Sequence, residues 1–423
     1  MLAGMTAEAP RRPIPLLGET DLGSRAARAL TTELTRHAGP KSGLLVSVTA
    51  RSAVLAAALD GLLPGDTLTL VPLAGAGDEL REHVASLGPW VGQRVRVIET
   101  LAEADPADVV VVAEPLGGTA EETRGYLDEL RKYLAEGGVL AVAAFAGPWF
   151  GAGAGAELAR QAALSGVGTD LVLRNTPPVR VHRLRYTPAP VTTTARLTPA
   201  YRPSSVPLTR SMNIDSNGVA AAGIALGLAA TARVLRPKSR LWLLPALAAV
   251  PVAAFFRDPN RDLPSDPAAI MAASDGTVLS VERLDDPRLG DDLLRVAVFL
   301  SVLDVHVNRA PVAGKVVEQW IEDGGYAPAM TPDAEHNVAA YTVLDTERGR
   351  VVVVQRTGLV ARRIVHRAPV GSLLARGERF GLIRFGSRTD VYLPASAASA
   401  TVGPGDKVLG GTTVIARWHP IFD

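Results

Sequence analysis

The chain has 423 residues, of which 47% are hydrophobic and 21% charged, and this composition is typical of a folded protein with two or three domains. The net charge of +1 gives no support to nucleic-acid binding, so we expect no nucleic-acid partner. The absence of cysteine excludes disulfides, thiolate metal sites and a cysteine nucleophile, and we expect no metal.

Residues 25–186 alternate between apolar runs typical of strands and stretches with helical periodicity, such as 51–62 and 119–135. The predicted strands are 43–50, 67–73, 94–100, 108–114, 138–145, 170–175 and 179–186. Short, almost wholly apolar strands separated by helices indicate an α/β fold with a parallel sheet covered on both faces. The last two runs are joined by Thr-Pro-Pro and can form an antiparallel edge pair.

This rhythm resembles a class I methyltransferase-like Rossmann domain, to which we assign residues 1–186. Such enzymes need a glycine-rich turn after the first strand so that the backbone can approach the cofactor. Here residues 48–56 read VTARSAVLA, without glycine, and no acidic residue closes the second strand to hold a ribose. We therefore predict a degenerate scaffolding or regulatory domain, with an active S-adenosylmethionine (SAM)-dependent methyltransferase as an alternative.

Residues 187–215 are rich in Pro, Thr and Ser and are predicted to be a linker. Residues 216–256 contain two uncharged apolar runs separated by the basic stretch RVLRPKSR. Each run, as a helix of about 16 residues, is roughly 24 Å long, shorter than the hydrocarbon core of about 30 Å. A full span would also place the basic turn outside, against the positive-inside tendency. We predict a peripheral or re-entrant membrane hairpin at the cytoplasmic face, with a buried helical pair as the alternative.

Residues 257–423 consist of short runs rich in β-branched residues, broken by Gly, Pro and Asp, and are predicted to be mostly β. The fold class is thus multidomain: an α/β Rossmann-like parallel sheet, an apolar helical hairpin and a mostly-β domain.

Seven stretches of this second half carry a resemblance, in family order. They are FFRDPNR (255–261), AASDGTV (272–278), LSVLDVHVNRAPVAGKV (300–316), HNVAAYTVLDTERG (336–349), RTGLVARRIV (356–365), RGERFGLIRFGSRTDVYLP (376–394) and VGPGDKVLGG (402–411). Together they make this half similar to phosphatidylserine decarboxylase, in its shorter archaeal-like branch. Residues 257–423 would then be the decarboxylase catalytic domain.

The resemblance implies that the chain cleaves itself between Gly386 and Ser387. Ser387 would attack the carbonyl of Gly386, the resulting ester would eliminate, and the dehydroalanine formed would hydrolyse to a pyruvoyl group. Glycine suits this position because it has no Cβ to shield its carbonyl. Many members have Leu-Gly-Ser-Thr here, whereas this chain has Phe-Gly-Ser-Arg. An ordinary turn at Gly-Ser is the alternative.

The family also implies a Ser-His-Asp arrangement, because serine is a weak nucleophile without a base. Asp275 matches the acidic member and His306 the first histidine of the central motif. Arg309 occupies the position of the second histidine, which is usually assigned to self-cleavage. Either His306 serves both steps, or Asp275 acts with another group. Arg309 is a candidate ligand for substrate carboxylate or phosphate, and His336 a candidate substrate contact.

The implied reaction converts phosphatidylserine to phosphatidylethanolamine through a Schiff base with the pyruvoyl group, and His306 would protonate the α-carbon. The expected partners are phosphatidylserine, the membrane lipid surface and the cleaved short chain, 387–423, with a homodimer left open. The alternatives are a non-enzymatic lipid-binding protein and a bifunctional enzyme with an active methyltransferase half.

Overall fold

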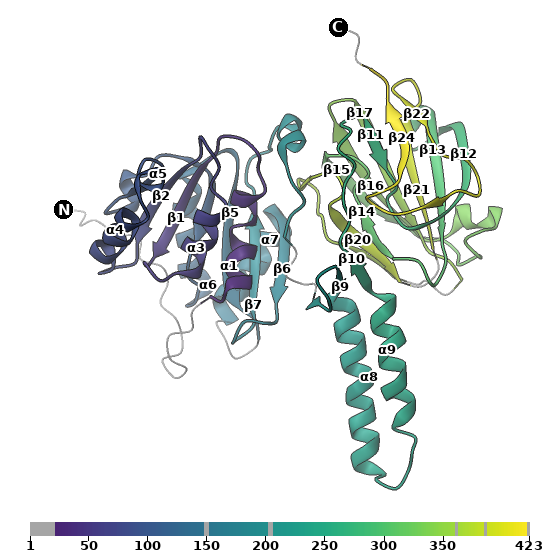
Figure 1. The fold of residues 1–423 in the computed structure, drawn as a ribbon, viewed down its shortest axis with the longest axis horizontal. Coiled ribbons are helices and arrows are strands. Elements are labelled where there is room, and N and C mark those ends of the chain that lie inside the picture. The colour runs from purple at the N-terminus through teal and green to yellow at the C-terminus, as the bar shows by residue number, and fades with distance from the viewer. Residues whose placement is uncertain (1–21, 148–151, 202–205, 360–362, 385–386, 421–423) are drawn as a thin grey trace. The chain divides into compact units, whose positions relative to one another are not determined.

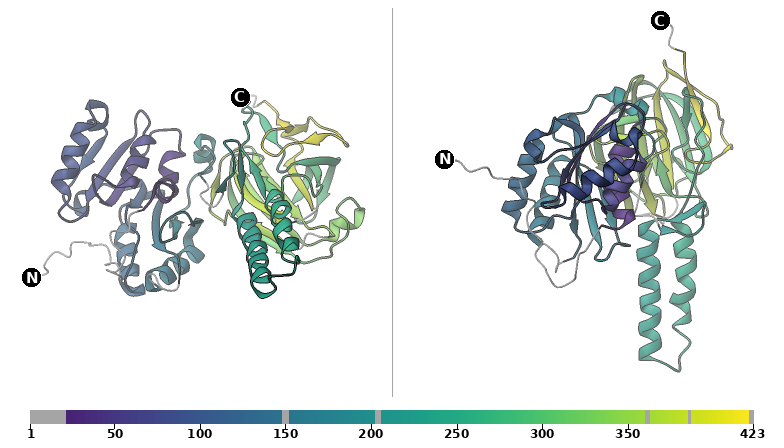
Figure 2. Two further views of the ribbon diagram at one scale, coloured as in Figure 1. Left: turned by 60° about the horizontal axis from the view of Figure 1, so that its bottom comes forward. Right: turned by 60° about the vertical axis from the view of Figure 1, so that its left-hand side comes forward.

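The computed structural model describes residues 22–147, 152–201, 206–359, 363–384 and 387–420 (Figures 1 and 2). The chain divides into two compact units, Met1–Ser204 and Ser205–Asp423. The first unit is an α/β domain. The second contains a helical hairpin and a mostly-β region, so the predicted fold class is confirmed.

The first unit is built on a seven-stranded sheet of order β3-β2-β1-β4-β5-β7-β6. Its strands are β1 (Ser42–Val48), β2 (Thr67–Pro72), β3 (Val95–Val97), β4 (Ala107–Val112), β5 (Leu134–Phe145), β6 (Gly166–Val172) and β7 (Val179–Leu184). The first five strands pair in parallel, and β7 runs antiparallel to both β5 and β6. The expected parallel sheet with an antiparallel edge pair is therefore present.

Helices cover both faces of this sheet (Figure 1). On one face α1 (Ser24–Leu30), α3 (Ala53–Asp60) and α4 (Gly77–Ser86) pack over Leu45 and Val111. On the other face, α6 (Ala120–Arg131) and α7 (Ala152–Ser165) pack over the strand residues that alternate with these, such as Val46 and Val110. Because successive strand residues alternate between faces, the nearly continuous apolar strands bury side chains on both sides. The short helices α2 (Thr32–Thr35) and α5 (Pro89–Gly92) complete the unit.

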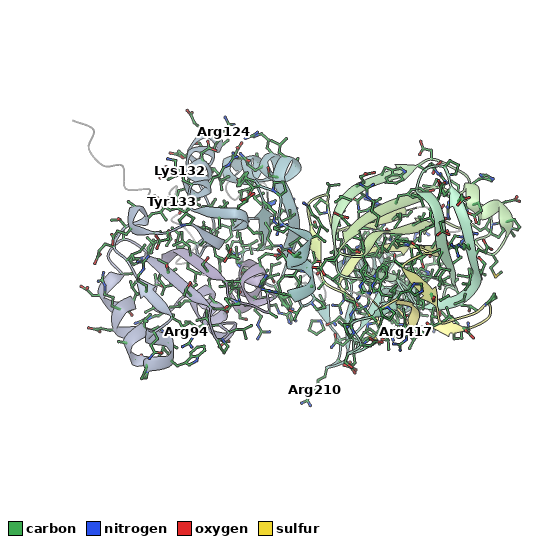
Figure 3. All side chains as sticks on the ribbon, turned by 90° about the horizontal axis from the view of Figure 1, so that it is seen from above. Arg94, Arg124, Lys132, Tyr133, Arg210 and Arg417 are labelled. Carbon is green, nitrogen blue, oxygen red and sulfur yellow. The ribbon has the colours of Figure 1, made fainter. Side chains whose placement is uncertain are left out.

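Surface cations of the first unit have local partners, and Arg94, Arg124 and Lys132 point outward in Figure 3. Arg124 donates to Glu157 at 3.2 Å, Lys132 donates to Glu129 at 2.5 Å, and the guanidinium of Arg94 lies 4.6 Å from the ring centre of Trp90.

The predicted linker, residues 187–215, is shared between the two units. The 3₁₀ turn Val191–Arg196 leads to Leu197, which bridges to His37 of the first unit. Further on, β8 (Val206–Pro207) and β9 (Met212–Ile214) pair in a small antiparallel sheet with β10 (Arg257–Pro259) of the second unit.

The helical hairpin consists of α8 (Ser216–Leu235) and α9 (Leu243–Phe255), which project from the β region in Figures 1 and 2. Asp215 begins α8, since its Oδ1 accepts a hydrogen bond from the Asn217 amide at 2.9 Å. Among the described residues, α8 is the helix long and apolar enough to cross a membrane, and only 11% of its apolar window is buried.

The β region of the second unit contains three antiparallel sheets. The largest has the order β19-β15-β16-β17-β21-β13-β12-β23, and the smaller two are β11-β24-β22 and β14-β20-β18. The strands are β11 (Ala269–Met271), β12 (Gly276–Asp286), β13 (Gly290–Leu300), β14 (Val307–Arg309), β15 (Gly314–Glu322), β16 (Ala339–Thr346), β17 (Gly349–Arg356), β18 (Arg363–His366), β19 (Leu373–Leu374), β20 (Arg379–Arg384), β21 (Ser387–Pro394), β22 (Ala398–Ala400), β23 (Lys407–Val408) and β24 (Val414–Trp418). Their inward side chains form one buried apolar cluster that includes Ile270, Val296, Val353 and Val391.

Candidate active site

Ser387 is the first residue of β21, a central strand of the large sheet. It is fully buried, and its Oγ has no hydrogen-bond partner within the described parts of the chain. A buried hydroxyl without a partner loses its hydration without compensation, which is uncommon in folded proteins. Within the described chain, the hydroxyl thus has no structural hydrogen bond to maintain. Gly386, the other predicted cleavage residue, lies outside the described residues.

The face of β21 that carries Ser387 is identified by Thr389. Residues two apart on a strand project to the same face, and Thr389 Oγ1 lies 2.6 Å from Ser274 Oγ. Ser387 thus points to the side of the sheet where the segment before β12 lies. That segment ends at Asp275, directly after Ser274.

Asp275 and Ser387 lie at the same end of three adjoining strands. Thr277 of β12 pairs with Phe299 of β13, which pairs in turn with Arg388 of β21. One strand separates the two residues, so their backbones are roughly 10 Å apart at a spacing of about 4.8 Å per strand. Gly276 has φ 153°, and a Cβ there would lie 2.1 Å from the Phe299 carbonyl oxygen, so this close approach requires glycine.

The carboxylate of Asp275 is buried and held from two sides. Oδ2 accepts a hydrogen bond from Arg261 Nη2 at 2.6 Å, and Oδ1 accepts one from the Gly410 amide at 2.8 Å. Burial raises the pKa of Asp275, although the Arg261 guanidinium opposes this shift. A carboxyl group with a raised pKa and a fixed orientation is suited to exchanging a proton.

His306 lies just before β14 and next to the end of β20. Its carbonyl oxygen accepts a hydrogen bond from the Ile383 amide at 3.2 Å, three residues before position 386. Its Nδ1 lies 2.9 Å from the Asp304 carbonyl oxygen, and its ring packs 4.3 Å from the ring centre of Phe255, the last residue of α9. Because a carbonyl can only accept, Nδ1 carries the proton and Nε2 has the lone pair of a base.

Burial lowers the pKa of His306 from its usual value of 6.5 to about 4. The unfolded chain therefore takes up a proton between pH 6.5 and about 4 that the folded chain does not. This contribution to stability is fully present above pH 6.5 and is lost as the pH falls through that window. A proton NMR titration is expected to place the His306 midpoint near 4, with the signal assigned by its loss in His306→Asn. A midpoint near 6.5 would contradict the buried, neutral imidazole.

Two residues of the site were not among the predicted ones. Asp304 accepts hydrogen bonds from the amide and hydroxyl of Ser301 at 2.8 and 2.6 Å, and its charge acts to raise the pKa of both Asp275 and His306. Arg261 holds Asp275. Both belong to stretches that carry the resemblance. The sequence feature that could have identified Asp304 is its position two residues before His306 in the same motif.

Arg309 is buried and bound to the chain itself. Its Nη2 donates to Asp258 Oδ1 at 2.9 Å and to the Pro259 carbonyl at 2.8 Å, and its Nη1 donates to the Gly377 carbonyl at 3.3 Å. Burial lowers the pKa of Arg309 to about 10, so it remains charged at neutral pH. These contacts fix the segment 258–261 that presents Arg261 to Asp275. Its role as a substrate ligand stays a prediction.

Replacing Arg309 with methionine is expected to destabilise the second unit by about 2–3 kcal/mol, below the usual loss for an uncompensated buried charge because Asp258 keeps one cation. Arg379, which lies 2.5 Å from Asp258 Oδ2, would be the remaining cation for that carboxylate. Denaturant unfolding measures the loss. Arg417→Met, which removes a half-exposed pair with Asp266, is the matched control and is expected to cost less than about 1 kcal/mol. Equal losses in the two variants would show that the buried pair contributes nothing beyond a surface one.

His336 is exposed at the end of the 3₁₀ turn Pro332–His336. The neighbouring Glu335 accepts a hydrogen bond from Arg388 Nη2 at 2.8 Å. Arg388 also donates to Asp390 at 2.6 Å, on the face of β21 opposite to Ser387. The structure thus places Ser387 and Asp275 at the same end of adjoining strands and bonds the His306 backbone to the strand that leads to position 386. Glu335, the neighbour of His336, reaches the opposite face of β21.

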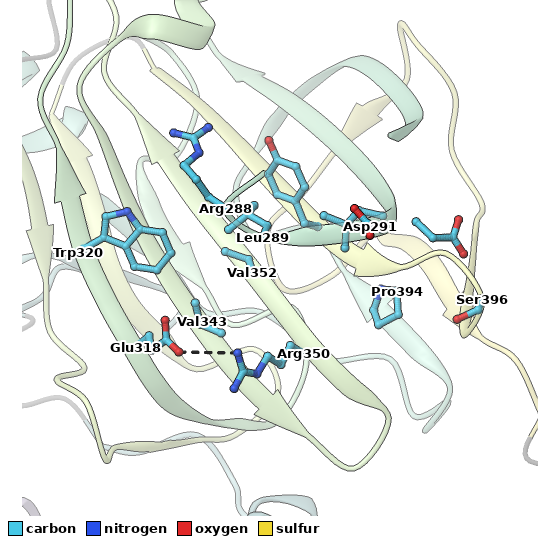
Figure 4. A pocket seen from close by; sticks show the side chains of 13 residues that line it. Arg288, Leu289, Asp291, Glu318, Trp320, Val343, Arg350, Val352, Pro394 and Ser396 are labelled. Atoms are coloured by element: carbon cyan, nitrogen blue, oxygen red, sulfur yellow. Dashed lines mark ion pairs between the residues drawn. The ribbon is translucent and has the colours of Figure 1, made fainter. Parts of the chain in front are cut away.

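A surface hollow of about 260 Å³ lies on that opposite face (Figure 4). It is lined by Trp320, Val343, Val352 and Tyr392, with Glu318 and Arg350 3.7 Å apart at its side. Tyr392 alternates with Ser387 and Thr389 along β21, so this hollow is not the site of the three predicted residues.

Comparison with known proteins identifies the second unit. A profile described as phosphatidylserine decarboxylase matches residues 250–416, the range that contains Asp275, His306 and Ser387. A phosphatidylserine decarboxylase proenzyme of Nitrosomonas eutropha is 44% identical over 42% of this chain and 84% of its own. The chain belongs to the phosphatidylserine decarboxylase family.

Two other phosphatidylserine decarboxylase proenzymes agree. That of Symbiobacterium thermophilum is 48% identical over 38% of this chain and 77% of its own, and that of Thermobifida fusca is 45% identical over 46% and 86%. As a member of the phosphatidylserine decarboxylase family the chain is a decarboxylase.

Solved methyltransferase structures also match part of the chain. The SAM-dependent methyltransferase SibL is 18% identical over 39% of this chain and 55% of its own, with a TM-score of 0.31. The O-methyltransferase TomG of Streptomyces achromogenes is 13% identical over 40% and 83%, with a TM-score of 0.31. The Rossmann-like fold of the first unit itself follows from its strand order.

Proposed function

We propose that this chain converts phosphatidylserine to phosphatidylethanolamine with a pyruvoyl group made from Ser387 by cleavage of the bond after Gly386. The observation that carries the proposal is the buried Ser387 hydroxyl, which has no hydrogen-bond partner among the described residues and lies at the same end of the sheet as Asp275. The position suits the group, because a ketone in place of the hydroxyl removes a buried donor that has no acceptor among the described residues.

Ser387 acts first as the nucleophile toward the carbonyl of Gly386, and a neighbouring base must take its proton. We assign this task to Asp275 or to Nε2 of His306. Asp275 has a raised pKa, which makes its carboxylate a stronger base, and His306 lies beside the strand that leads to the cleavage position. Arg261 and the Gly410 amide keep the Asp275 carboxylate oriented during this step.

The pyruvoyl group supplies an electron-withdrawing carbonyl that takes the substrate amine and accepts the electron pair left by departing CO₂. The substrate ammonium must lose a proton before it reacts, and His306 Nε2, neutral at physiological pH, can accept it. The same imidazolium then donates a proton to the α-carbon where CO₂ was lost. His306 thus moves one proton from the amine to the carbon.

The short chain, 387–423, is proposed to stay bound after cleavage. β21 pairs along its length with β13 on one side and along much of it with β17 on the other, and β24 pairs with β11. Cleavage removes the backbone nitrogen of Ser387 but leaves the pairs from Arg388 onward in place. The two chains would separate only under denaturing conditions. A homodimer is a further proposal, to be tested by the mass in solution.

The family is membrane associated, and we propose that the hairpin is the membrane element, peripheral or re-entrant at the cytoplasmic face. At 1.5 Å per residue α8 is about 30 Å long and α9 about 20 Å, so α9 is short of a full span. The basic residues Arg233, Arg236, Lys238 and Arg240 lie at or near the tip between the helices, where anionic headgroups can bind them.

We keep the proposed division of the chain: a degenerate methyltransferase-like scaffold at 1–186, a linker at 187–215, the hairpin at 216–256 and the catalytic domain at 257–423. A bifunctional enzyme is the second candidate, supported only by the strand order of the first unit. Calorimetry of the full chain with SAM tests it, and the absence of binding heat would remove it.

The purified full chain, incubated with phosphatidylserine labelled at the headgroup carboxyl carbon, is expected to release labelled CO₂. Intact-mass analysis should show two chains that meet at 386/387, the shorter one blocked at its amino end and reducible by borohydride. A fully active preparation that contains only the uncleaved chain would contradict the proposal. Cleaved chain without CO₂ release would favour the lipid-binding alternative.

A further inference from the structure

A turn between β13 and β14 presents two apolar side chains to solvent. Val302 is 57% exposed and Leu303 is 82% exposed, while Leu300 and Val305 on either side are buried. Single exposed apolar residues are common on protein surfaces, so exposure alone carries no conclusion. Two adjacent ones at the apex of a turn make a small apolar tip.

The turn is built to hold this tip outward. Asp304 accepts hydrogen bonds from the amide and hydroxyl of Ser301, and the Asp304 amide donates back to the Ser301 carbonyl at 3.0 Å. These bonds join Ser301 and Asp304, the first and last residues of the turn, as in other turns stabilised by an aspartate side chain. Val302 and Leu303 are therefore displayed by a closed turn.

The turn adjoins the base of the hairpin. Arg257, two residues after α9 ends, donates a hydrogen bond to the Leu303 carbonyl. His306, three residues after Leu303, packs its ring against Phe255 at the end of α9. The apolar tip thus lies between the point where the hairpin leaves the β region, seen in Figure 1, and the proposed catalytic histidine.

The hairpin is apolar on all sides, which indicates the level of the bilayer surface. Ile224 and Leu226 are 67% and 54% exposed, and residues two apart point to nearly opposite sides of a helix. On α9, Leu244 and Leu247 are both 68% exposed. A helix that lies flat on a membrane has one polar face, whereas these helices need apolar surroundings all round. This favours the re-entrant form of the proposed hairpin, in which the chain enters and leaves the bilayer at the base of the hairpin, so that the base lies at the level of the headgroups.

Positive charge gathers at the same base. Arg384 Nη2 donates to Asn217 Oδ1, in the first turn of α8, at 2.6 Å, and Arg363 pairs with Arg384 across β18 and β20. Arg363 is exposed, and Arg257 contacts the turn itself. Basic residues at this level are attracted to anionic lipid headgroups.

We propose that Val302 and Leu303 form a second membrane contact, which enters an anionic phospholipid bilayer beside the hairpin and holds the site at the level of the phosphatidylserine headgroup. The inference rests on the proposed function only for the identity of that headgroup. We assign this contact to the bilayer because the tip adjoins the base of the hairpin and the arginines around it can bind anionic lipid headgroups.

The absence of cysteine allows a direct test, since a single introduced cysteine is labelled uniquely. Leu303→Cys in the full chain, carrying an environment-sensitive fluorophore, is mixed with vesicles of phosphatidylserine and phosphatidylcholine. The emission is expected to shift to the blue and to be quenched by nitroxides near the lipid headgroups. Ile321→Cys, at a position 59% exposed on β15, is the matched control and should show neither change. An unshifted, unquenched label at 303 would overturn the proposal without any measurement of turnover.

Kinetics give a second readout. In Val302→Ser/Leu303→Ser we expect the vesicle concentration for half-maximal rate to rise about tenfold or more, because burial of a Val or Leu side chain is worth at least such a factor. Turnover of a monomeric short-chain phosphatidylserine should be unchanged, as should both rates in Ile321→Ser. Equal loss on both substrates would mean that the turn acts through the site and would overturn the proposal. Failure of the unsubstituted chain to act on the short-chain lipid would contradict the proposed function instead, and the fluorophore would still decide the contact.

Discussion

Replacing Ser387 with alanine is expected to leave the chain uncleaved and to lower decarboxylation by more than about 10⁴-fold, because the variant lacks both the nucleophile and the atoms of the future carbonyl. The substitution should not harm the fold. The hydroxyl is buried without a partner among the described residues, so its removal breaks no hydrogen bond seen in the structure. Denaturing electrophoresis and CO₂ release are the measurements.

Ser396→Ala is the matched control, since Ser396 is an exposed serine in the same short chain. It should be cleaved and active like the unsubstituted protein, and both variants should unfold within about 0.5 kcal/mol of it. A short chain that begins at residue 387 in the alanine variant would show that another group breaks the backbone. Full activity without cleavage would remove the pyruvoyl mechanism altogether.

Replacing His306 with asparagine is expected to lower the rate of decarboxylation per mole of short chain by about 10²–10⁴-fold, the usual contribution of a positioned acid or base. Asparagine can keep a donor near the Asp304 carbonyl, but it has no atom that accepts and returns a proton at neutral pH. Normalising the rate to the amount of short chain separates this effect from any loss of self-cleavage.

The control for this variant is His419→Asn, which changes an exposed histidine near the end of the described chain. It should retain the full rate. If His306→Asn stops cleavage but its residual short chain turns over normally, His306 is the base of self-cleavage alone and the α-carbon receives its proton elsewhere. If cleavage is normal and turnover is lost, the base of cleavage is Asp275 or a group that acts with it.

Local sequence patterns predicted the helices and strands well, because the periodicity of a strand or helix depends on residues that are close in the chain. The alternating strands and helices of the first unit, the two apolar helices and the β-rich second half all follow from such patterns. Element boundaries differed. Residues 119–135 were expected to be helical and 138–145 to form a strand, but α6 ends at Arg131 and β5 begins at Leu134. Gly137 has φ 73° inside the strand, a conformation that glycine tolerates in a strand as well as at a helix end.

The sequence by itself determined the family and predicted the Gly-Ser bond and the residue types of the chemistry, because these are carried by short contiguous motifs. Only the tertiary structure decided how they meet. Arg261 and Asp275 are 14 positions apart, Asp258 and Arg309 are 51 apart, and Ser274 and Thr389 are 115 apart. Such contacts depend on the register of strands that are distant in the chain. The same holds for the charge state of His306, since burial of its ring comes from packing against the end of the hairpin.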